Sequence, residues 1–207
     1  MSFKLSTRHL RRALDEVARR DADVKRGLRL VGYPKERRSG GPSFEHLLRI
    51  IVGQQISTQA AASVYAKLAA ALGRVEPRRF LALSDAQLRA QGLSRQKIAY
   101  GRILSEAVAS RRLVPERLAE LPDEEVVAAI TALKGFGRWS AEMFLLFSLG
   151  RPDVWPSTDL GIQGGLKKLK KLRTRPSPAR AEKIAWPWRP YRGAMAVFVW
   201  HYYSNAP

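Results

Sequence analysis

The sequence predicts an all-α protein. Apolar residues recur at helical spacing along most of its 207 residues, and no run alternates apolar and polar residues over the length of a strand. Serines precede several of these periodic segments, as is typical of helix N-termini. A chain of this length can bury one substantial core or form two lobes that share a groove, so we expect a single unit over residues 1–207.

The first half of the chain contains helices with clear start signals. The first predicted helix covers about residues 7–20, with its apolar residues on one face, and a linker is expected over 34–43. Serine caps then introduce four predicted helices, which are 44–53 after Ser43, 58–73 after Ser57, 85–92 after Ser84 and 95–110 after Ser94. Gly73 would end the second of these four helices.

The second half continues in the same way. A helix with acidic residues in its first turn is expected from residue 122, and another from Arg138 to about residue 149. Asp159 heads a further apolar-periodic segment. Residues 173–180 are predicted to form a proline-rich loop before the last helix, which begins at Arg192.

The charge of the chain points to a polyanionic partner. Lys and Arg total 37 against 18 Asp and Glu, giving a net charge of +19 at pH 7. Nucleic acid is the first partner to consider, and a basic surface that is merely solvated is the alternative. The densest basic stretch, "KKLKKLRTR", covers residues 167–175.

The absence of cysteine excludes disulfides, thiolate zinc sites and iron–sulfur clusters. The three scattered histidines show no ligand spacing, so we expect no metal and no cofactor. No apolar run approaches the roughly 20 residues of a membrane helix, and the N-terminus lacks a secretory signal. We therefore expect a soluble, intracellular monomer without a membrane partner, which in a bacterium would be cytoplasmic and nucleoid-associated.

Residues 133–139, "LKGFGRW", interrupt the helical pattern with two glycines. Because Gly135 and Gly137 can adopt positive φ and have no side chain, the backbone amides at the start of the next helix would be open to a phosphate group. Lys134 and Arg138 would add positive charge on either side. An ordinary turn between two helices is the alternative interpretation.

Asp159 is the candidate acidic residue. The helix over 139–149 is about 16 Å long, and the nine residues 150–158 can span up to about 30 Å, so Asp159 can lie beside Trp139. At a helix N-terminus the dipole and the backbone amides stabilise a carboxylate. The alternative is that Asp159 serves only as an N-cap.

Four stretches together resemble the helix-hairpin-helix DNA glycosylases, and most of all their alkylpurine branch, the methyladenine DNA glycosylase II type. These stretches are "IIVGQQISTQAA" at 50–61, "LKGFGRWSA" at 133–141, "RPDVWPSTD" at 151–159 and "WRPYRGAMAVFVW" at 188–200. They follow one another in the family's order and with similar intervals. The resemblance extends from about Ser43 to Tyr203.

The resemblance implies a compact two-lobed helical bundle with a helix-hairpin-helix motif and a DNA-binding groove between the lobes. Its parts would be an N-terminal helical segment and linker over 1–42, a helical lobe over 43–132, the helix-hairpin-helix over 133–149, and the catalytic loop with the C-terminal helices over 150–207. The implied partner is double-stranded DNA that contains alkylated bases. The implied reaction removes such a base, of the 3-methyladenine or 7-methylguanine type, and leaves an abasic site in base excision repair.

The resemblance also implies roles for individual residues. Asp159 matches the catalytic aspartate, which would stabilise the positively charged sugar and orient water, whereas Asp153 is interpreted as structural. Trp139 stands where lyase-competent members have a lysine that forms a Schiff base, so we expect a monofunctional enzyme. A tryptophan also offers a π face to a cationic purine.

Further residues are assigned in the same way. Trp200 matches a second wall of the base pocket, although its apolar helix would be buried anyway, and Met143 takes a position where relatives can have an aromatic pocket residue. Gln55, preceded by Gln54, matches the side chain that fills the gap left by the flipped base. The expected contacts to DNA phosphates are Lys134, Gly135, Phe136, Gly137 and Arg138. Arg192 matches a recurrent family arginine with either a phosphate-binding or a structural role.

Two departures from the family pattern and two alternative functions stay open. Lys134 replaces the usual hairpin proline, and Gly161, Gly164 and Gly165 either loosen the helix after Asp159 or allow close packing. The first alternative function is a non-catalytic helix-hairpin-helix protein that only binds DNA. The second is a glycosylase for another base, such as hypoxanthine, uracil or an oxidised purine.

Overall fold

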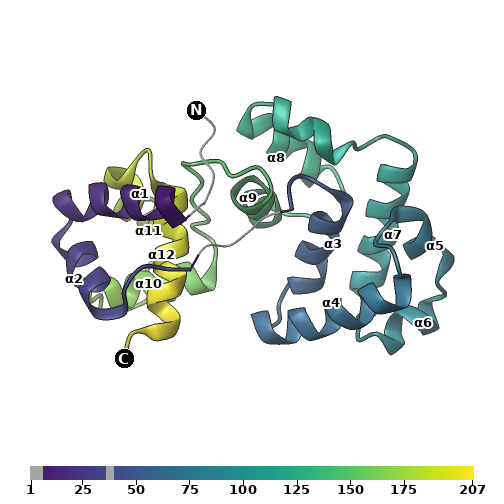
Figure 1. Ribbon diagram of the computed structural model, residues 1–207, viewed down its shortest axis with the longest axis horizontal. Coiled ribbons are helices and arrows are strands. Elements are labelled where there is room, and N and C mark those ends of the chain that lie inside the picture. Colours follow the sequence, from purple (N-terminus) through teal and green to yellow (C-terminus); the bar gives the residue numbers. More distant parts are fainter. Residues whose placement is uncertain (1–6, 36–39) are drawn as a thin grey trace. The chain divides into compact units, whose positions relative to one another are not determined.

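The computed structural model describes residues 7–35 and 40–207, and within these ranges all regular structure is helical (Figure 1). The prediction of an all-α protein is confirmed. The chain divides into two compact units. The terminal unit contains the described residues 7–35 and 145–207, and the central unit contains residues 40–144. Residues 7–35 therefore pack with the C-terminal part of the chain.

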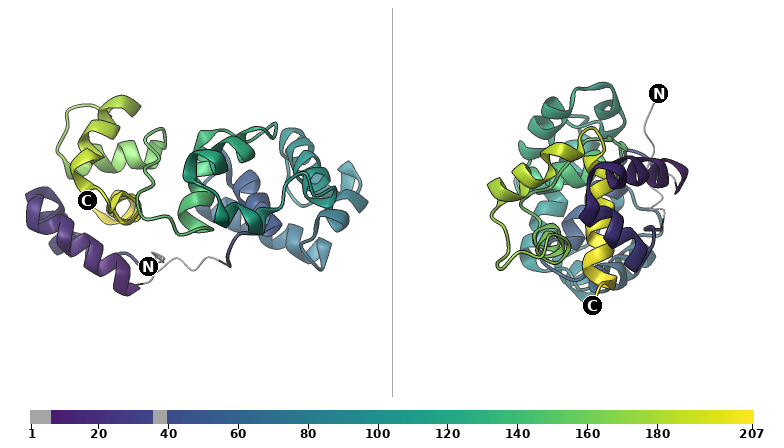
Figure 2. Two further views of the ribbon diagram at one scale, coloured as in Figure 1. Left: turned by 90° about the horizontal axis from the view of Figure 1, so that it is seen from above. Right: turned by 90° about the vertical axis from the view of Figure 1, so that its left-hand side faces the viewer.

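The terminal unit is built around its last helix, α12 (Arg192–Asn205). Residues 192–199 are all buried, and α12 packs against elements from both ends of the chain (Figures 1 and 2). These are α1 (Thr7–Arg20), α2 (Ala22–Val31), α10 (Leu160–Leu169) and the 3-10 helix η2 (Trp186–Trp188). Helix α11 (Pro178–Ala185) lies between α10 and η2 in the chain and contacts both.

The glycines of α10 allow close packing against α12. A Cβ atom at Gly164 would lie 2.6 Å from the Tyr203 ring, and one at Gly165 would lie 2.5 Å from the Val199 side chain. Only a residue without a side chain fits at these distances. Of the two explanations left open by the sequence, the structure supports close packing.

The central unit contains the remaining helices. They are α3 (Phe44–Gly53), α4 (Thr58–Leu72), α5 (Pro77–Ala82), α6 (Asp85–Ala90), α7 (Arg95–Ala109), the 3-10 helix η1 (Pro115–Glu120), α8 (Asp123–Thr131) and the first part of α9 (Arg138–Phe147). Helix α9 continues into the terminal unit at Leu145. Leu47, Leu48 and Ile51 of α3 and Leu104 of α7 are fully buried, which places the core of the unit between α3 and α7.

The predicted helix caps are confirmed. Each of the four serines accepts a hydrogen bond from the backbone amide three residues later, and Ser84 forms a full capping box with Gln87. Gly73 ends α4 with φ +68°. The local side chains therefore determine where these helices begin and end.

Helix α2 has no counterpart among the helices predicted from the sequence. A Cβ at Gly27 would lie 2.8 Å from Leu169, so close packing requires this glycine. The predicted loop over 173–180 is wrong for its last residues. Ser177 caps α11 and Pro178 occupies its first turn, where proline has no amide to leave unsatisfied.

Part of the predicted linker over 34–43 lies outside the described residues, namely positions 36–39. Among the residues that are described, none of the helices combines the length and apolarity that crossing a bilayer requires. The predicted groove between lobes stays a prediction.

Candidate functional site

Asp159 is the N-cap of α10, as the sequence predicted, but capping is only one of its contacts. Its Oδ1 atom accepts a hydrogen bond from the Ile162 amide at 2.8 Å. The same oxygen accepts a hydrogen bond from the Trp200 indole Nε1 at 2.8 Å. Because two donors from different helices converge on Oδ1, the orientation of the half-buried carboxylate is fixed.

The surroundings of Asp159 and Trp200 are packed to preserve this contact. A Cβ at Gly161 would lie 3.0 Å from both Asp159 Oδ1 and Trp200 Cδ1, closer than most side chains approach one another. On α9, Phe147 lies against the Trp200 ring with a centroid separation of 5.8 Å. Trp200 is half-buried, whereas the eight residues before it are buried. Sequence reasoning did not identify the roles of Gly161 and Phe147.

Asp153, the rival carboxylate, is structural, as predicted. It accepts hydrogen bonds from the Arg192 guanidinium at 2.9 and 2.8 Å, and Arg192 also pairs with Glu182 at 2.7 Å. Arg192 is buried among these partners. Of the two roles considered for Arg192, the structure supports the structural one.

The hairpin before α9 packs against the aromatic ring of Tyr100. Gly135 has φ +101°, and a Cβ there would lie 2.2 Å from the ring of Tyr100 on α7. Gly137, by contrast, does not have a positive φ, so the expectation for this glycine is wrong. A Cβ at Gly137 would contact nothing within 4 Å, and the residue is exposed. Tyr100 received no functional interpretation from the sequence, yet it determines the position of the hairpin.

The two adjacent glutamines differ in their surroundings. The Gln54 side chain is half-buried and donates hydrogen bonds to the Gly135 carbonyl at 2.9 Å and to Ser140 Oγ at 3.3 Å. Gln55 is exposed and has φ +59°, which is uncommon for a residue other than glycine. Gln54 therefore supports the hairpin, and Gln55 is the glutamine presented to solvent.

The backbone and charges of the hairpin are only partly available to a ligand. The Phe136 amide donates to the Leu133 carbonyl at 3.0 Å, and the Phe136 side chain is buried. Arg138 pairs with Glu124 at 3.0 Å and with Glu142 at 3.3 Å. Hydrogen bonding between Arg138 and Glu124 raises the pKa of the arginine and lowers the pKa of the glutamate. Lys134 is exposed.

Two predicted base-pocket residues lie on one face of α9. Trp139 and Met143 are four residues apart, so their side chains are neighbours on the helix. Trp139 is half-buried and Met143 is buried. The structure thus brings together Asp159 with Trp200 in the terminal unit, and the hairpin with Gln54, Trp139 and Met143 in the central unit.

A family model describing HhH-GPD superfamily base excision DNA repair proteins matches residues 48–190. The chain belongs to this superfamily. The matched residues of this HhH-GPD protein include Gln54, Gln55, the hairpin and Asp159, whereas Trp200 lies beyond the match. The DNA-3-methyladenine glycosylase 1 of Schizosaccharomyces pombe is 32% identical over 186 residues, which is 87% of this chain and 82% of the relative.

Solved structures of HhH-GPD relatives agree with this assignment. The S. pombe 3-methyladenine DNA glycosylase Mag1 in complex with abasic DNA matches with a TM-score of 0.87 and 30% identity, over 91% of this chain and 95% of that one. A DNA-3-methyladenine glycosidase from Bacillus halodurans matches with a TM-score of 0.72 and 31% identity, over 91% and 87% of the two chains. The fold of the HhH-GPD family is therefore present over nearly the whole protein.

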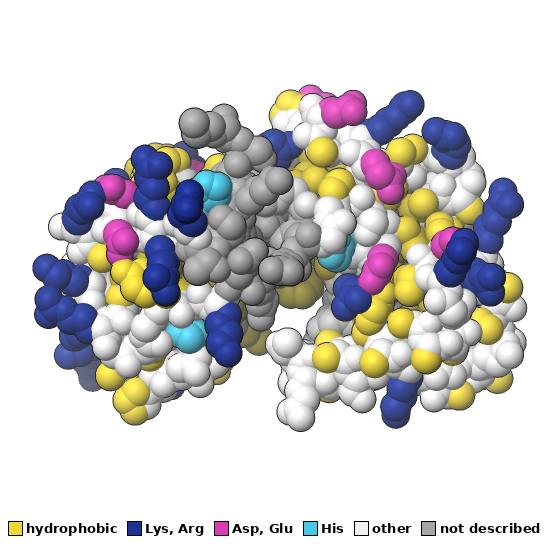
Figure 3. Space-filling view, in the orientation of Figure 1, with side chains coloured by type: hydrophobic (Ala, Val, Ile, Leu, Met, Phe, Trp, Pro, Cys, Tyr) yellow, Lys and Arg dark blue, Asp and Glu magenta, His cyan; other side chains and the backbone are white. Residues whose placement is uncertain are grey.

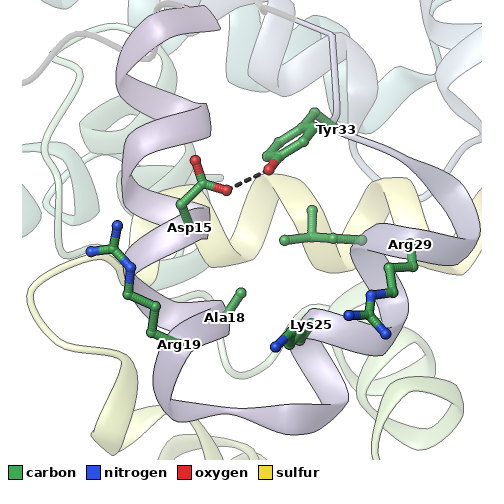
Figure 4. Close-up of a pocket in the computed structure, with 7 residues that line it drawn as sticks. Asp15, Ala18, Arg19, Lys25, Arg29 and Tyr33 are labelled. Atoms are coloured by element: carbon green, nitrogen blue, oxygen red, sulfur yellow. Dashed lines mark hydrogen bonds between the residues drawn. The ribbon is translucent and has the colours of Figure 1, made fainter.

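A separate open pocket of this HhH-GPD protein lies between α1 and α2 (Figure 4). It is lined by Asp15, Ala18, Arg19, Lys25, Leu28, Arg29 and Tyr33. The Tyr33 hydroxyl donates a hydrogen bond to Asp15 across one side of the pocket. None of the predicted site residues lines it.

Proposed function

We propose that the protein is a monofunctional DNA glycosylase that excises alkylated purines of the 3-methyladenine and 7-methylguanine type. Its partner would be double-stranded DNA with such lesions, its product an abasic site, and its working form a monomer without a cofactor. Support comes from relatives named for this activity that are about 30% identical over most of their length. The hairpin and the matched aspartate are both present.

The observation that carries this proposal is the double hydrogen bond to Asp159 Oδ1. In the reaction, the bond between C1′ of the sugar and the purine nitrogen breaks, and both electrons leave with the base. The sugar becomes positively charged until water adds to C1′ and loses a proton. A carboxylate held in place by Ile162 and Trp200 needs no reorganisation to stabilise that charge.

The absence of lyase activity is proposed from Trp139. A Schiff base with the sugar requires an amine, and the indole of Trp139 cannot form one. Its ring would instead stack on the purine, whose positive charge after alkylation adds a cation–π component. The positive charge also weakens the bond that must break, so moderate transition-state stabilisation suffices.

DNA binding is assigned to the hairpin and the exposed glutamine. The exposed backbone at Gly137 and the side chain of Lys134 would contact phosphates, whereas Arg138 is engaged with Glu124 and Glu142. Gln55 would enter the gap left by the flipped base. Gln54 would hold the hairpin in position through Gly135 and Ser140.

Methylated duplex DNA provides the test. Incubation with the protein followed by alkali should break strands at the lesions, and Asp159→Asn should slow base release by at least about 100-fold, because one fixed charge is lost. The control is Asp85→Asn, an exposed aspartate on α6 that should leave the rate unchanged. Bound DNA without any base release by the wild type would identify a non-catalytic binding protein instead.

Two further measurements test the absence of lyase activity and the identity of the excised base. Borohydride should trap no covalent complex between the wild type and damaged DNA, and strand breaks without alkali would contradict the role given to Trp139. Release of hypoxanthine, uracil or an oxidised purine in preference to methylated purines would keep the chemistry and change the substrate.

A further inference from the structure

The densest basic stretch of the chain is not used by the proposed reaction. Residues 167–175, here called the basic turn, contain six lysines and arginines and no acidic residue. Five of the six are exposed, namely Lys167, Lys168, Lys171, Arg173 and Arg175. The sixth, Lys170, points inward and pairs with Asp21 at 2.7 Å and Asp23 at 3.1 Å.

The basic turn has a fixed backbone. The Lys171 amide donates to the Lys168 carbonyl at 3.2 Å, and the Leu172 amide donates to the Lys167 carbonyl at 2.9 Å, which is the hydrogen-bond pattern of a Schellman motif. Arg26 of α2 donates to the Leu169 carbonyl at 3.2 Å, and Leu169 is fully buried. The exposed cations are therefore presented from a rigid base.

Folding alone does not explain the charges of the basic turn. Lys167 and Lys168 belong to the last turn of α10, where cations complement the helix dipole, and Lys168 also donates to the Ala206 carbonyl at 2.8 Å. Lys171, however, has φ +50°, a conformation in which helices prefer glycine. Arg173 and Arg175 lie beyond the helix and add repulsion between like charges.

The charge of the whole chain is unequally divided between its units. Residues 1–39 and 145–207 contain 23 Lys and Arg against 8 Asp and Glu, a net charge of +15. Residues 40–144, which include the hairpin, contain 14 against 10, a net charge of +4. Dark-blue Lys and Arg side chains are prominent over α1 and α2 in the space-filling view (Figure 3). Most of the attraction for a polyanion must therefore come from outside the hairpin-bearing unit.

We propose that the basic turn is a second contact for the phosphate backbone of duplex DNA, separate from the nucleotides that meet Asp159. The ten residues of α10 place it about 15 Å from Asp159, at the opposite end of the helix. Phosphate oxygens suit its five exposed cations, and such a contact raises affinity without reading sequence. This inference rests on the proposed function, because it takes DNA as the partner.

A matched pair of single variants tests the inference. Lys171→Gly and Arg111→Gly each remove one exposed cation at positive φ, +50° and +60°, the first in the basic turn and the second after α7. Neither should lower the Tm, because glycine adopts this backbone without strain. Lys171→Gly should weaken binding to undamaged duplex by about fivefold at about 0.15 M salt, the effect of one lost phosphate contact. Arg111→Gly should not weaken it.

A pair of variants with four substitutions each measures the number of phosphate contacts made by the basic turn. Replacing Lys167, Lys171, Arg173 and Arg175 with Gln should reduce the magnitude of the slope of log K against log salt by about 3.6, since each phosphate contact contributes about 0.9. The control replaces the exposed Arg78, Arg79, Arg111 and Arg112 with Gln, which removes the same net charge from the central unit. Equal changes of slope for the two variants, or no change for either, would overturn the inference.

Binding to undamaged duplex requires no base release, so the two proposals can fail separately. If methylated DNA is not cleaved but the basic-turn variants still lower the salt slope, only the proposed function is wrong. If bases are released and the salt slope does not depend on the basic turn, only the second contact is wrong.

Discussion

Helices α10 and α9 begin in opposite ways, and in the proposed function this difference separates chemistry from binding. The N-terminus of α10 contains its own anion, Asp159, whose Oδ1 accepts from Ile162 and Trp200. Helix α9 begins after Gly137, whose carbonyl accepts the first helical hydrogen bonds. Gly137 has no side chain to act as a cap. In the proposed function, the first helix end holds a negative charge for a positive sugar, and the second offers backbone to a negative phosphate.

The supports of the two helix ends also differ. Asp159 is oriented by the Trp200 indole, with Gly161 keeping space for the contact. The hairpin is held by the Tyr100 ring beneath Gly135 and by Gln54. Variants of Asp159, Trp200 and Gly161 should therefore change the rate of base release, whereas variants of the hairpin and its supports should change stability and DNA affinity.

The largest effect on stability is expected for Gly135→Ala. A Cβ at φ +101° and 2.2 Å from Tyr100 should lower the free energy of unfolding by about 3 kcal/mol, combining backbone strain with overpacking. Denaturant unfolding measures this loss. Gly137→Ala is the matched control, because its Cβ would meet open space, and it should change stability by less than about 0.5 kcal/mol. Equal losses would show that Tyr100 does not support the hairpin.

The contact of Asp21 with Lys170, the C-cap of α10, should make stability depend on pH. Burial raises the pKa of Asp21. The hydrogen bonds from Lys170, Trp188 and the Val24 amide, together with the positive charge of Lys170, outweigh it, so the pKa lies below its ordinary value of 3.8. A lowered carboxyl pKa contributes stability that is present above pH 3.8 and is lost as the pH falls below it.

Asp21→Asn should therefore cost about 2 kcal/mol at neutral pH, and the difference from wild type should shrink below about pH 4. Asparagine caps a helix as well as aspartate, so the cap of α2 is retained. The change removes the negative charge together with the acceptor of the Trp188 indole. Unfolding curves at several pH values give the comparison. A difference that does not depend on pH would contradict the assigned contact with Lys170.

Trp200→Phe should slow base release by about tenfold under single-turnover conditions, because a hydrogen bond to a charged carboxylate is lost while an aromatic ring is retained. Trp186→Phe, at an exposed tryptophan of η2, should leave the rate unchanged. A Trp200→Phe enzyme with the wild-type rate would show that the indole does not orient Asp159.

The smallest effect separates the two glutamines. Gln54→Ala should lower the free energy of unfolding by about 1 kcal/mol through its lost bond to Gly135. Gln55→Asn shortens an exposed side chain and tolerates positive φ, so stability should not change, whereas binding to abasic DNA should weaken. The reverse pattern would exchange the roles of the two residues.

Much of the fold was predictable because local side chains determine it. The serine caps and Asp159 at the start of α10 follow from hydrogen bonds within a few residues. Helix α2 was not predicted, and the glycine within it, Gly27, packs against Leu169, which is far away in the sequence. The start of α11 was missed because proline at the first helical position was taken as a loop signal.

The candidate site was predictable in its residue types but not in its contacts. Periodicity gives no means of knowing that Trp200 donates to Asp159, or that Arg138 is engaged with Glu124 and Glu142. Nor does it show which of two adjacent glutamines turns outward. Apart from the pair of Arg138 with Glu142, which lies within α9, these contacts join elements that are apart in the sequence.

In the proposed reaction, the carboxylate of Asp159 stabilises a positively charged sugar. A duplex that contains a cationic pyrrolidine in place of one deoxyribose resembles that sugar, and a duplex with a neutral tetrahydrofuran has the same shape without the charge. The wild type should bind the cationic duplex at least about 100-fold more tightly than the neutral one, as expected for a transition-state analogue. Asp159→Asn should bind both equally, whereas a variant that keeps the full preference would contradict the claim.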